Sequence, residues 1–481
     1  MTMNPTFLSA TRLASMVRAR EIGCRELLDH YIARVERLDP RINAVVVRDF
    51  ERARVRAAKL DNTTDRGAPL FGVPMTIKES FNVAGLPTTW GAPAYRDSTA
   101  AGNALAVDRF LNAGVVLFGK TNVPLMLADW QSYNVIYGTT NNPWNVALSP
   151  GGSSGGSAAA LAAGLTGIEA GSDIGSSIRN PAHYCGVYGH KPTWGICPPL
   201  GQSLAGNVAQ ADISVIGPLA RSADDLSVAL DVMAGPEDIE NGWKLDLPPP
   251  RATRFKGLRV AMMTDHPCSE VDASITGRFA ELADFLRREG ASVSVTARPE
   301  FDLARGHRLY IEMLRATTSA RSDAAAMEHW RAEAARLAFD DASYYAMMAR
   351  GISMSHRDFL LGNDQRQRMR RAWAAFFRDW DVFLCPAAAS PAQPHDHAGE
   401  RWERCITVNG HRVPATDQMF WAGISGFYLL PATAAPLGLS PDGLPVGVQI
   451  VGAQYADRTT IQVAKLLETA WQGFVPPPGW E

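Results

Sequence analysis

Two serines that lie among glycines are the residues whose type and spacing best fit covalent chemistry. Ser153 belongs to the run PGGSSGGS at residues 150–157, and Ser177 belongs to the run GSDIGSSIR at residues 171–179. Glycine-lined turns let a backbone approach a substrate closely and expose N–H groups that stabilise negative charge. The two runs therefore predict a site for a serine nucleophile.

The residues between the two serines predict how they meet. The small residues of 154–165 favour a helix about 15 Å long, and residues 167–172 favour a strand of about 17 Å. A chain that passes along this helix and returns along a strand of similar length brings Ser177 back to the end where Ser153 began. The N–H groups of residues 174–177 then point into the space between the two hydroxyls.

Lys78 is the leading candidate for the base, because no neighbouring His or Asp completes an obvious triad. It ends the apolar stretch FGVPMTIK (residues 71–78), which is typical of a buried strand. Lysine is rare here, with 7 lysines among the 47 basic residues, so this one is less typical of generic surface charge. A lysine base must lose about 3 pKa units, roughly 4 kcal/mol, which desolvation can supply.

The chain resembles the amidase signature family of serine hydrolases along nearly its whole length. The matching motifs are GVPMTIKESFNVAGLPTTWG (72–91), NPWN (142–145), the two serine–glycine runs, GPLARS (217–222) and DGLPVGVQIVG (442–452). The resemblance implies that Ser177 is the nucleophile, Ser153 the middle serine and Lys78 the base. It also implies a cis peptide bond between Gly152 and Ser153.

One residue departs from the family pattern. Family members usually have two glycines before the nucleophile, whereas Gly175 is followed here by Ser176. Because only the N–H is needed at this position, we expect the side chain of Ser176 to project away from the site. The N–H groups expected to bind the oxyanion are those of Ile174, Gly175, Ser176 and Ser177.

Charged neighbours of the nucleophile are expected to support it. Asp173 and Arg179 should hold the 174–177 turn by charge-assisted hydrogen bonds. An ordinary structural ion pair is the alternative, and the two roles are compatible. Ser154, next to the middle serine, is expected in the same supporting shell.

The resemblance implies a substrate pocket lined by the segment before NPWN and by the C-terminal strand region. The residues expected there are Leu127, Asp129, Trp130, Tyr133, Trp421 and Phe427, with Trp90 as a further aromatic candidate. Packing in the core is the competing interpretation for each aromatic residue. Residues 125–133 contain no Arg or Lys to pair with a substrate carboxylate, so neutral aryl or medium aliphatic amides are expected. Asp129 facing a substrate amine is the alternative.

The fold class expected is α/β, and the resemblance implies the amidase-signature fold, a large twisted mixed β-sheet covered by helices on both faces. Strands and helices alternate between residues 70 and 235, which agrees with it. We expect a single amidase domain over residues 1–481. Its parts are N-terminal helices (1–65, with amphipathic helices at 8–38 and 48–60), the signature core (66–240), a mainly helical cap (265–400) and strands that rejoin the core (425–470).

Composition excludes several classes of protein. The net charge of −2 and the lack of basic stripes give no case for nucleic-acid binding. The first 30 residues have no signal-peptide pattern, and no apolar run of 18 residues predicts a membrane span. Six scattered cysteines without a C-x-x-C pair favour a reducing cytoplasm.

Three motifs are judged coincidental. Residues 114–121 (GVVLFGKT) satisfy the P-loop pattern, but residues 115–118 are expected to form a strand rather than a phosphate-binding loop. Residues 151–155 match the G-x-S-x-G elbow, yet the residues before them are loop-like. His395 and His397 lack further metal ligands, so no metal is expected.

The sequence therefore predicts hydrolysis of a linear carboxylic amide through an acyl-enzyme on Ser177, with no metal or organic cofactor. The partner expected is a small-molecule amide, and a homodimer is left open. One rival is a glutaminase subunit of a tRNA-dependent amidotransferase, although Lys78 is followed here by Glu-Ser rather than the usual Asp-Asn. The other rival is a P-loop nucleotide-binding protein.

Overall fold

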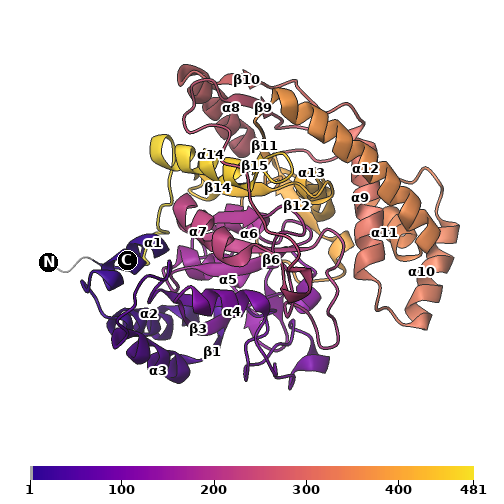
Figure 1. The fold of residues 1–481 in the computed structure, drawn as a ribbon. Helices are drawn as coiled ribbons and strands as arrows, with labels where there is room; N and C mark the ends of the chain where they lie inside the picture. Colours follow the sequence, from indigo (N-terminus) through magenta and orange to yellow (C-terminus); the bar gives the residue numbers. More distant parts are fainter. Residues whose placement is uncertain (1–3) are drawn as a thin grey trace.

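The computed structural model describes residues 4–481 and contains two principal β-sheets surrounded by helices (Figure 1). The larger sheet has eight strands in the order β10-β9-β11-β15-β14-β7-β8-β6. Its strands are β6 (Glu169–Asp173), β7 (Tyr188–Lys191), β8 (Val215–Ala220), β9 (Arg259–Met262), β10 (Ser292–Ser294), β11 (Val382–Pro386), β14 (Ala432–Leu439) and β15 (Pro445–Val451). The sheet is mixed, because β9 pairs parallel with β10 and β11 while the other pairs are antiparallel.

A three-stranded sheet in the order β1-β3-β2 carries the lysine of the site. Its strands are β1 (Val45–Arg48), β2 (Pro74–Lys78) and β3 (Val116–Thr121). An isolated parallel bridge between Met75 and Ile168 brings β2 to the β6 edge of the larger sheet. The strand predicted at residues 74–78 is confirmed, and it lies at this junction rather than inside the large sheet.

Helices pack on both faces of the eight-stranded sheet, as predicted, and others cover the small sheet or stand apart. The α-helices of the described residues are α1 (Ala10–Arg18), α2 (Cys24–Leu38), α3 (Phe50–Asp61), α4 (Leu105–Asn112), α5 (Gly155–Ala162), α6 (Arg179–Cys185), α7 (Ala223–Met233), α8 (Ala273–Arg288), α9 (Leu303–Thr318), α10 (Ala324–Arg336), α11 (Tyr344–Ile352), α12 (His356–Asp379), α13 (Met419–Gly426) and α14 (Asp457–Ala470). Gln449 of β15 accepts a hydrogen bond from Arg179 of α6. Across the sheet Gln449 pairs with Ala434 of β14, and the neighbouring Thr433 forms a hydrogen bond with Thr460 of α14. Because successive strand residues point to opposite faces, α6 and α14 cover opposite sides of the sheet.

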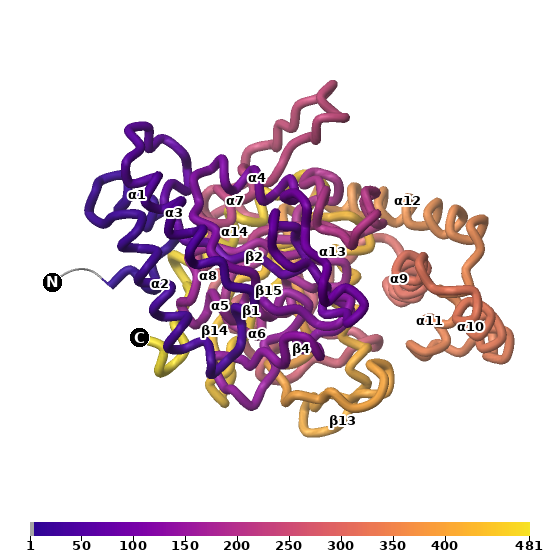
Figure 2. The backbone as a smooth tube through the Cα atoms, turned by 90° about the horizontal axis from the view of Figure 1, so that it is seen from below, coloured from indigo at the N-terminus to yellow at the C-terminus, as the bar shows by residue number. Residues whose placement is uncertain are grey.

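Two short hairpins complete the strands. They are β4 (Tyr133–Asn134) with β5 (Gly138–Thr139), and β12 (Cys405–Val408) with β13 (His411–Pro414). The β12–β13 pair forms an orange projection near the lower edge of Figure 2. The residues just before β12 supply an arginine to the site.

The helix predicted over residues 8–38 is wrong as a continuous element. The chain forms α1 and α2 instead, with a break at residues 19–23 where Arg20 has a φ of 61°. The left-handed conformation ends the first helix, and Gly23 begins the second. Each helix then presents its own apolar face to the core.

Helices α9 to α12 form a separate group at one side of the sheets, in orange tones at the right of Figure 1. Figure 2 shows this group opposite the indigo N-terminal helices, with both chain ends on the N-terminal side. Residues 265–400 are thus rich in helix, as expected, but they also supply β10 and β11 to the large sheet. Helix α9 packs against α13 and so reaches the core.

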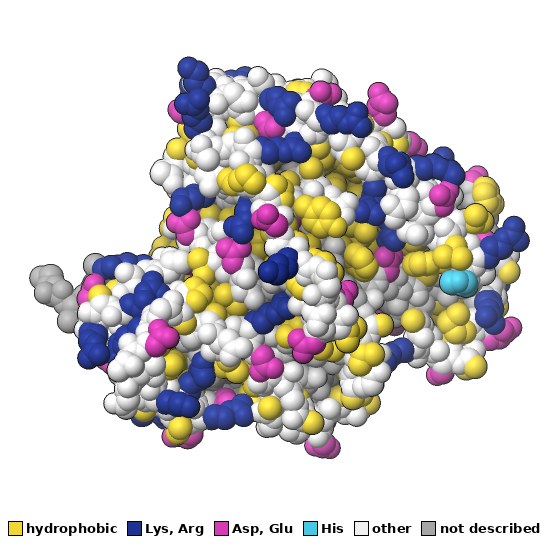
Figure 3. All heavy atoms as spheres, viewed as in Figure 1, with side chains coloured by type: hydrophobic (Ala, Val, Ile, Leu, Met, Phe, Trp, Pro, Cys, Tyr) yellow, Lys and Arg dark blue, Asp and Glu magenta, His cyan; other side chains and the backbone are white. Residues whose placement is uncertain are grey.

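The visible surface mixes acidic and basic side chains, without a patch of one sign (Figure 3). This matches the net charge of −2. Within residues 4–481, the helices are all too short or too polar to cross a lipid bilayer.

Candidate active site

Lys78 ends β2, a strand whose five residues are all buried. Its Nζ donates to Ser153 Oγ at 2.7 Å and to Ser172 Oγ at 3.0 Å. Complete burial of the ammonium lowers the pKa of Lys78 from 10.5 to about 7, although the charges of Asp173 and Glu169 act in the opposite direction. A large share of this lysine is therefore neutral near pH 7 and able to accept a proton.

Glu169 is the second unusual titratable group beside the lysine. Burial raises the pKa of its carboxyl to about 8, against hydrogen bonds from hydroxyl groups that include Thr76. Its negative charge therefore develops in about the pH range in which Lys78 loses its proton, and that charge opposes the loss. Desolvation of the ammonium is what lowers the pKa of Lys78.

Ser153 lies just before α5, after a cis peptide bond between Gly152 and Ser153. The resemblance implied this bond, and the structure contains it. The start of α5 packs tightly against the residue that follows β3, since a Cβ at Gly156 would collide with the backbone of Asn122. Glycine at this position lets the helix begin beside the end of β2 and β3.

Ser177 lies in the turn after β6, and its side chain is 5 % exposed. The backbone N–H of Ser154 donates to the carbonyl of Ser177 at 3.0 Å, so the two serine segments lie side by side. The predicted helix and returning strand are present as α5 and β6. The topology therefore brings Ser153 and Ser177 to the same end of the sheet, next to Lys78.

Asp173 and Arg179 organise the turn that carries Ser177. The Asp173 carboxylate accepts from the N–H groups of Ser176 at 2.9 Å and Ile178 at 3.1 Å, and from two nitrogens of Arg179 at 2.9 and 2.7 Å. Burial opposes ionisation of Asp173, but the Arg179 charge and these hydrogen bonds outweigh it and lower its pKa. The expected charge-assisted contacts are therefore present, in a fully buried ion pair.

Arg179 also ties this turn to the C-terminal part of the chain. Its guanidinium donates to Gln449 Oε1 at 2.6 Å, to Ser425 Oγ at 2.8 Å and to the Ala422 carbonyl at 3.0 Å. Ser154, the other expected supporting residue, is buried, and its Oγ donates to the Ser172 carbonyl at 3.4 Å. The nucleophile turn is thus fixed from two sides.

The expected set of oxyanion donors needs one correction. The N–H of Ser176 donates to Asp173 and is not free to bind an oxyanion, which leaves the N–H groups of Ile174, Gly175 and Ser177. Ser176 also has a φ of 72°, a left-handed conformation that favours glycine, and its buried hydroxyl has no partner within residues 4–481. The departure from Gly-Gly therefore strains the turn.

Comparison with known proteins identifies the family. The model of the family described as Amidase matches residues 26–461. The chain belongs to the amidase family. It is 31% identical to the acylamidase of Rhodococcus erythropolis over 474 residues, which cover 97% of this chain and 96% of that protein. It is also 30% identical to a glutamyl-tRNA(Gln) amidotransferase subunit of Acidothermus cellulolyticus over 500 residues, covering 96% of this chain and 94% of that one.

A solved structure supports the same assignment. A bacterial aryl acylamidase of the amidase signature family superposes with a TM-score of 0.81 at 26% identity, over 98% of this chain and 97% of that one. The protein is therefore an amide-hydrolysing enzyme with the mixed α/β fold of amidase signature enzymes.

Three of the predicted pocket residues of the amidase lie close to the nucleophile turn or to one another. Trp130 Nε1 donates to the Gly175 carbonyl at 2.6 Å. Asp129 forms an ion pair with Arg404 at 2.6 Å, and the same arginine donates to the Tyr133 hydroxyl at 2.9 Å. The expectation that no arginine lies near residues 125–133 is therefore wrong, because Arg404 comes from a segment about 270 residues away. Asp129 is paired with Arg404, which competes with the alternative in which it faces a substrate amine.

The remaining predicted pocket residues contribute less. Trp421 and Phe427 are completely buried, so the competing interpretation as core residues holds for both. Phe427 packs against Tyr310 with a ring-centroid distance of 5.9 Å. Leu127 lies in the same loop as Asp129 and is only partly buried. The further candidate, Trp90, donates to the Ser80 carbonyl at 3.3 Å.

Sequence reasoning missed several residues at the site. Tyr310 of α9 donates to the Ile174 carbonyl at 3.4 Å, and Met419 Cε lies 3.0 Å from the point where a Cβ would stand on Gly175. Nothing near either residue in sequence marks it, since tertiary folding alone brings it there. Ser172 could have been predicted from the sequence, because it stands next to Asp173 in the serine–glycine run of residues 171–179.

Residues of the rejected P-loop and metal motifs make structural contacts. Lys120 lies inside β3, is completely buried and donates to the Pro87 carbonyl and to Thr88 Oγ1. A strand cannot wrap phosphates, so the P-loop interpretation is excluded. The ring of His397 stacks on Tyr133 at 3.6 Å. In the part of the chain that the structure describes, no three His, Cys, Asp or Glu side chains gather as a metal site would require.

Proposed function

We propose that the enzyme hydrolyses a linear carboxylic amide through an acyl-enzyme on Ser177. Neutral Lys78 accepts a proton from Ser153, and Ser153 in turn accepts the proton of Ser177. At the same time the Ser177 oxygen attacks the carbonyl carbon of the substrate amide. The N–H groups of Ile174, Gly175 and Ser177 stabilise the oxyanion. The same relay protonates the leaving amine, and water then attacks the ester to release the acid and free Ser177.

A single observation carries this proposal: a buried lysine with a pKa of about 7 contacts Ser153 at 2.7 Å. Burial also lowers the pKa of the structural Lys120, to about 8, but Lys120 contacts the Pro87 carbonyl and the Thr88 hydroxyl. Lys78 differs because it contacts two serine hydroxyls, in a region where the backbone joins Ser154 to Ser177. Base, relay and nucleophile segment are therefore contiguous.

Substitution of the three residues tests the relay. Ser177→Ala should abolish turnover and labelling by a fluorophosphonate. Ser153→Ala and Lys78→Met should each slow acylation by about 10² to 10⁴-fold, the range of general acid–base catalysis. Ser269→Ala is a matched control, since its hydroxyl is also buried but has no hydrogen-bond partner within residues 4–481. Full activity in Ser177→Ala would contradict the proposal.

For the substrate, we propose a neutral aryl or medium aliphatic amide. This is supported by Trp130 at the nucleophile turn and by the pairing of Asp129 with Arg404, which neutralises the carboxylate on that side of the site. The acylamidase of R. erythropolis and the bacterial aryl acylamidase structure favour the same class. Esters of the same acids should also be cleaved, because they form the same acyl-enzyme.

One observation favours a second candidate, a glutaminase-like activity on a substrate that carries a carboxylate. Arg315 of α9 is 9% exposed, and within residues 4–481 no carboxylate pairs with it; its contact is the Tyr344 hydroxyl. Arg401, whose charge also acts on Tyr344, donates to the Ala128 carbonyl beside the predicted pocket. The relationship to glutamyl-tRNA(Gln) amidotransferases supports this alternative.

The ratio of kcat/KM for a neutral anilide to that for glutamine decides between the two candidates. Faster turnover of the anilide supports the first. Faster turnover of glutamine, lost in Arg315→Met but kept in the exposed control Arg321→Met, supports the second.

The six free cysteines fit the predicted reducing cytoplasm. A homodimer remains the assembly to test, by light scattering.

A further inference from the structure

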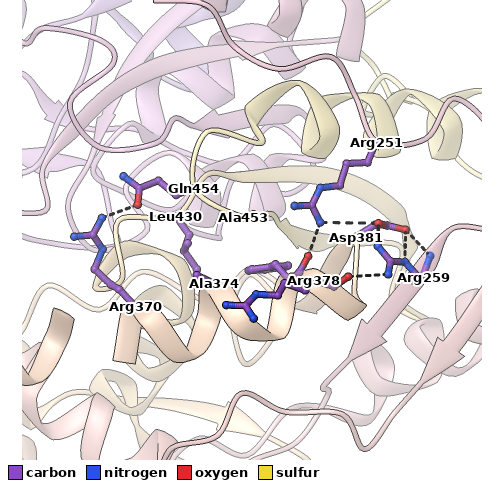
Figure 4. A pocket seen from close by; sticks show the side chains of 10 residues that line it. Arg251, Arg259, Arg370, Ala374, Arg378, Asp381, Leu430, Ala453 and Gln454 are labelled. Atoms are coloured by element: carbon purple, nitrogen blue, oxygen red, sulfur yellow. Dashed lines mark hydrogen bonds and ion pairs between the residues drawn. The ribbon is translucent and has the colours of Figure 1, made fainter. Parts of the chain in front are cut away.

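A cavity of about 500 Å³ lies away from the serines, where α12 meets the segment before β9 and the turn after β15 (Figure 4). Its lining residues are Arg251, Arg259, Arg370, Ala374, Phe377, Arg378, Asp381, Leu430, Ala453 and Gln454. None of them belongs to the proposed catalytic machinery. The size falls in the range of about 300–1,000 Å³ that is usual for small-molecule sites.

The cavity has a marked excess of positive charge. Four arginines line it, and the only carboxylate among the lining residues is that of Asp381. Arg259 forms the closer ion pair with this carboxylate, with nitrogen–oxygen distances of 2.6 and 3.2 Å, whereas Arg251 lies 3.9 Å from it. Within residues 4–481, no carboxylate pairs with Arg370 or Arg378.

Three of the guanidinium groups are held in place by uncharged acceptors. Arg251 donates to the Phe377 carbonyl at 2.6 Å, Arg259 to the Arg378 carbonyl at 2.8 Å, and Arg370 to Gln454 Oε1 at 2.7 Å. In addition, Nε of Arg370 is buried and has no hydrogen-bond partner within the described residues. These contacts orient the arginines, and of the three only Arg259 is also held closely by the Asp381 carboxylate. Figure 4 shows Arg370 beside Gln454 at one end of the cavity and Arg251 and Arg259 beside Asp381 at the other.

This arrangement favours a multiply charged anion over a neutral ligand. The guanidinium fork matches phosphate oxygens with two parallel hydrogen bonds, and its weak hydration makes it suited to such recognition. The charge of Asp379 also acts on Arg259, but Arg370 and Arg378 have no carboxylate partner within residues 4–481, and two positive charges match a dianion. The side chains of Ala374, Phe377 and Leu430 provide an apolar portion of the lining, where the body of a ligand larger than inorganic phosphate can lie.

We propose that this cavity binds the phosphate group of a small phosphate monoester, at a site distinct from the amide-hydrolysing site. The phosphate binds the guanidinium of Arg378, which has no carboxylate partner within residues 4–481, and the ester group extends over Ala374 and Phe377. Arg370, eight residues earlier on α12, adds positive charge from one end of the cavity. Inorganic phosphate shares the charged part of this recognition and binds more weakly, because it makes no apolar contact.

Isothermal titration calorimetry of the purified full chain at physiological salt tests the proposal, with phenyl phosphate, inorganic phosphate and phenol as probes. Phenyl phosphate should bind and phenol should not. Arg378→Gln should weaken phenyl phosphate binding about tenfold or more, the loss expected for one charge-assisted contact. Arg370→Gln should weaken it by a smaller factor, because it removes a positive charge of the cavity and not a direct contact. Arg371→Gln is the matched control, since it removes the same charge from the same helix at an exposed position that does not line the cavity.

The outcomes separate clearly. Equal affinity for the two phosphates identifies free phosphate as the ligand and still supports the site. Absence of phosphate binding at millimolar concentration overturns the proposal, and so does an equal loss in Arg371→Gln, which would show diffuse attraction to a basic helix. Arg378 is exposed, so Arg378→Gln should fold. This variant therefore still tests the site if Arg370→Gln does not fold. Anilide hydrolysis should be unchanged in all three variants.

Discussion

The protonation state of Lys78 should set the pH dependence of amide hydrolysis. Burial lowers its pKa from 10.5 to about 7. At pH 7 about half of the lysine is then neutral, whereas a lysine with an ordinary pKa would be neutral in only about one molecule in 3,000. Desolvation thus raises the population of active enzyme by about three orders of magnitude. Since the neutral form is the base, activity rises with pH, and at pH 6 kcat/KM should be about a tenth of its plateau.

Glu169→Gln perturbs this equilibrium with little change in shape. The ionised carboxylate raises the pKa of Lys78, so an uncharged amide should move the midpoint of the rise to lower pH. Burial places the pKa of Glu169 at about 8, so in the wild-type enzyme it gains charge in the range where Lys78 loses its proton. The two titrations are therefore coupled, and the wild-type rise should be broader than that of the variant.

The assay is kcat/KM for a neutral anilide in buffers of constant ionic strength from about pH 5 to about 9. Glu281→Gln is a control, because this carboxylate is exposed on α8. A flat profile, or a midpoint that moves to higher pH in Glu169→Gln, would refute the assignment of Lys78 as the base.

Three further substitutions test the supporting structure. Arg179→Met should lower the free energy of unfolding by about 3–5 kcal/mol in urea titration, because it leaves the Asp173 charge buried and unpaired, and adding Asp173→Asn should restore part of that loss. Ser176→Gly should raise the free energy of unfolding by about 1 kcal/mol, because glycine tolerates the left-handed backbone and the unpartnered hydroxyl is removed. A destabilised variant would show that the turn is not strained. Lys120→Met should cost about 1–3 kcal/mol by removing a donor from Pro87 and Thr88, while the rate stays independent of ATP and Mg²⁺; an ATP-stimulated rate would revive the nucleotide-binding interpretation.

Sequence reasoning singled out the residues of the proposed triad because each is marked locally. Lys78 ends an apolar strand, and the lengths of α5 and β6 alone bring the segments of Ser153 and Ser177 together. These features depend on contacts within about 100 residues and on backbone geometry that small residues permit.

The lining of the site could not be predicted in the same way. Arg404 meets Asp129 only because the hairpin after residue 404 folds back on the core, and Tyr310 meets Ile174 because α9 packs beside α13. The use of the Ser176 N–H by Asp173 depends on a single rotamer of one carboxylate. The proposed substrate preference depends on these contacts, and none of them is marked in the sequence.

Direct detection of the acyl-enzyme tests the central claim. After rapid mixing with a p-nitrophenyl ester and an acid quench, intact-protein and peptide mass spectrometry should reveal one acyl group on Ser177. The group should disappear on longer incubation as water releases the acid. Ser177→Ala should remain unmodified, and Ser153→Ala should acylate slowly at the same residue. An acyl group on any other side chain, or amide turnover with a correctly folded Ser177→Ala enzyme, would contradict the account.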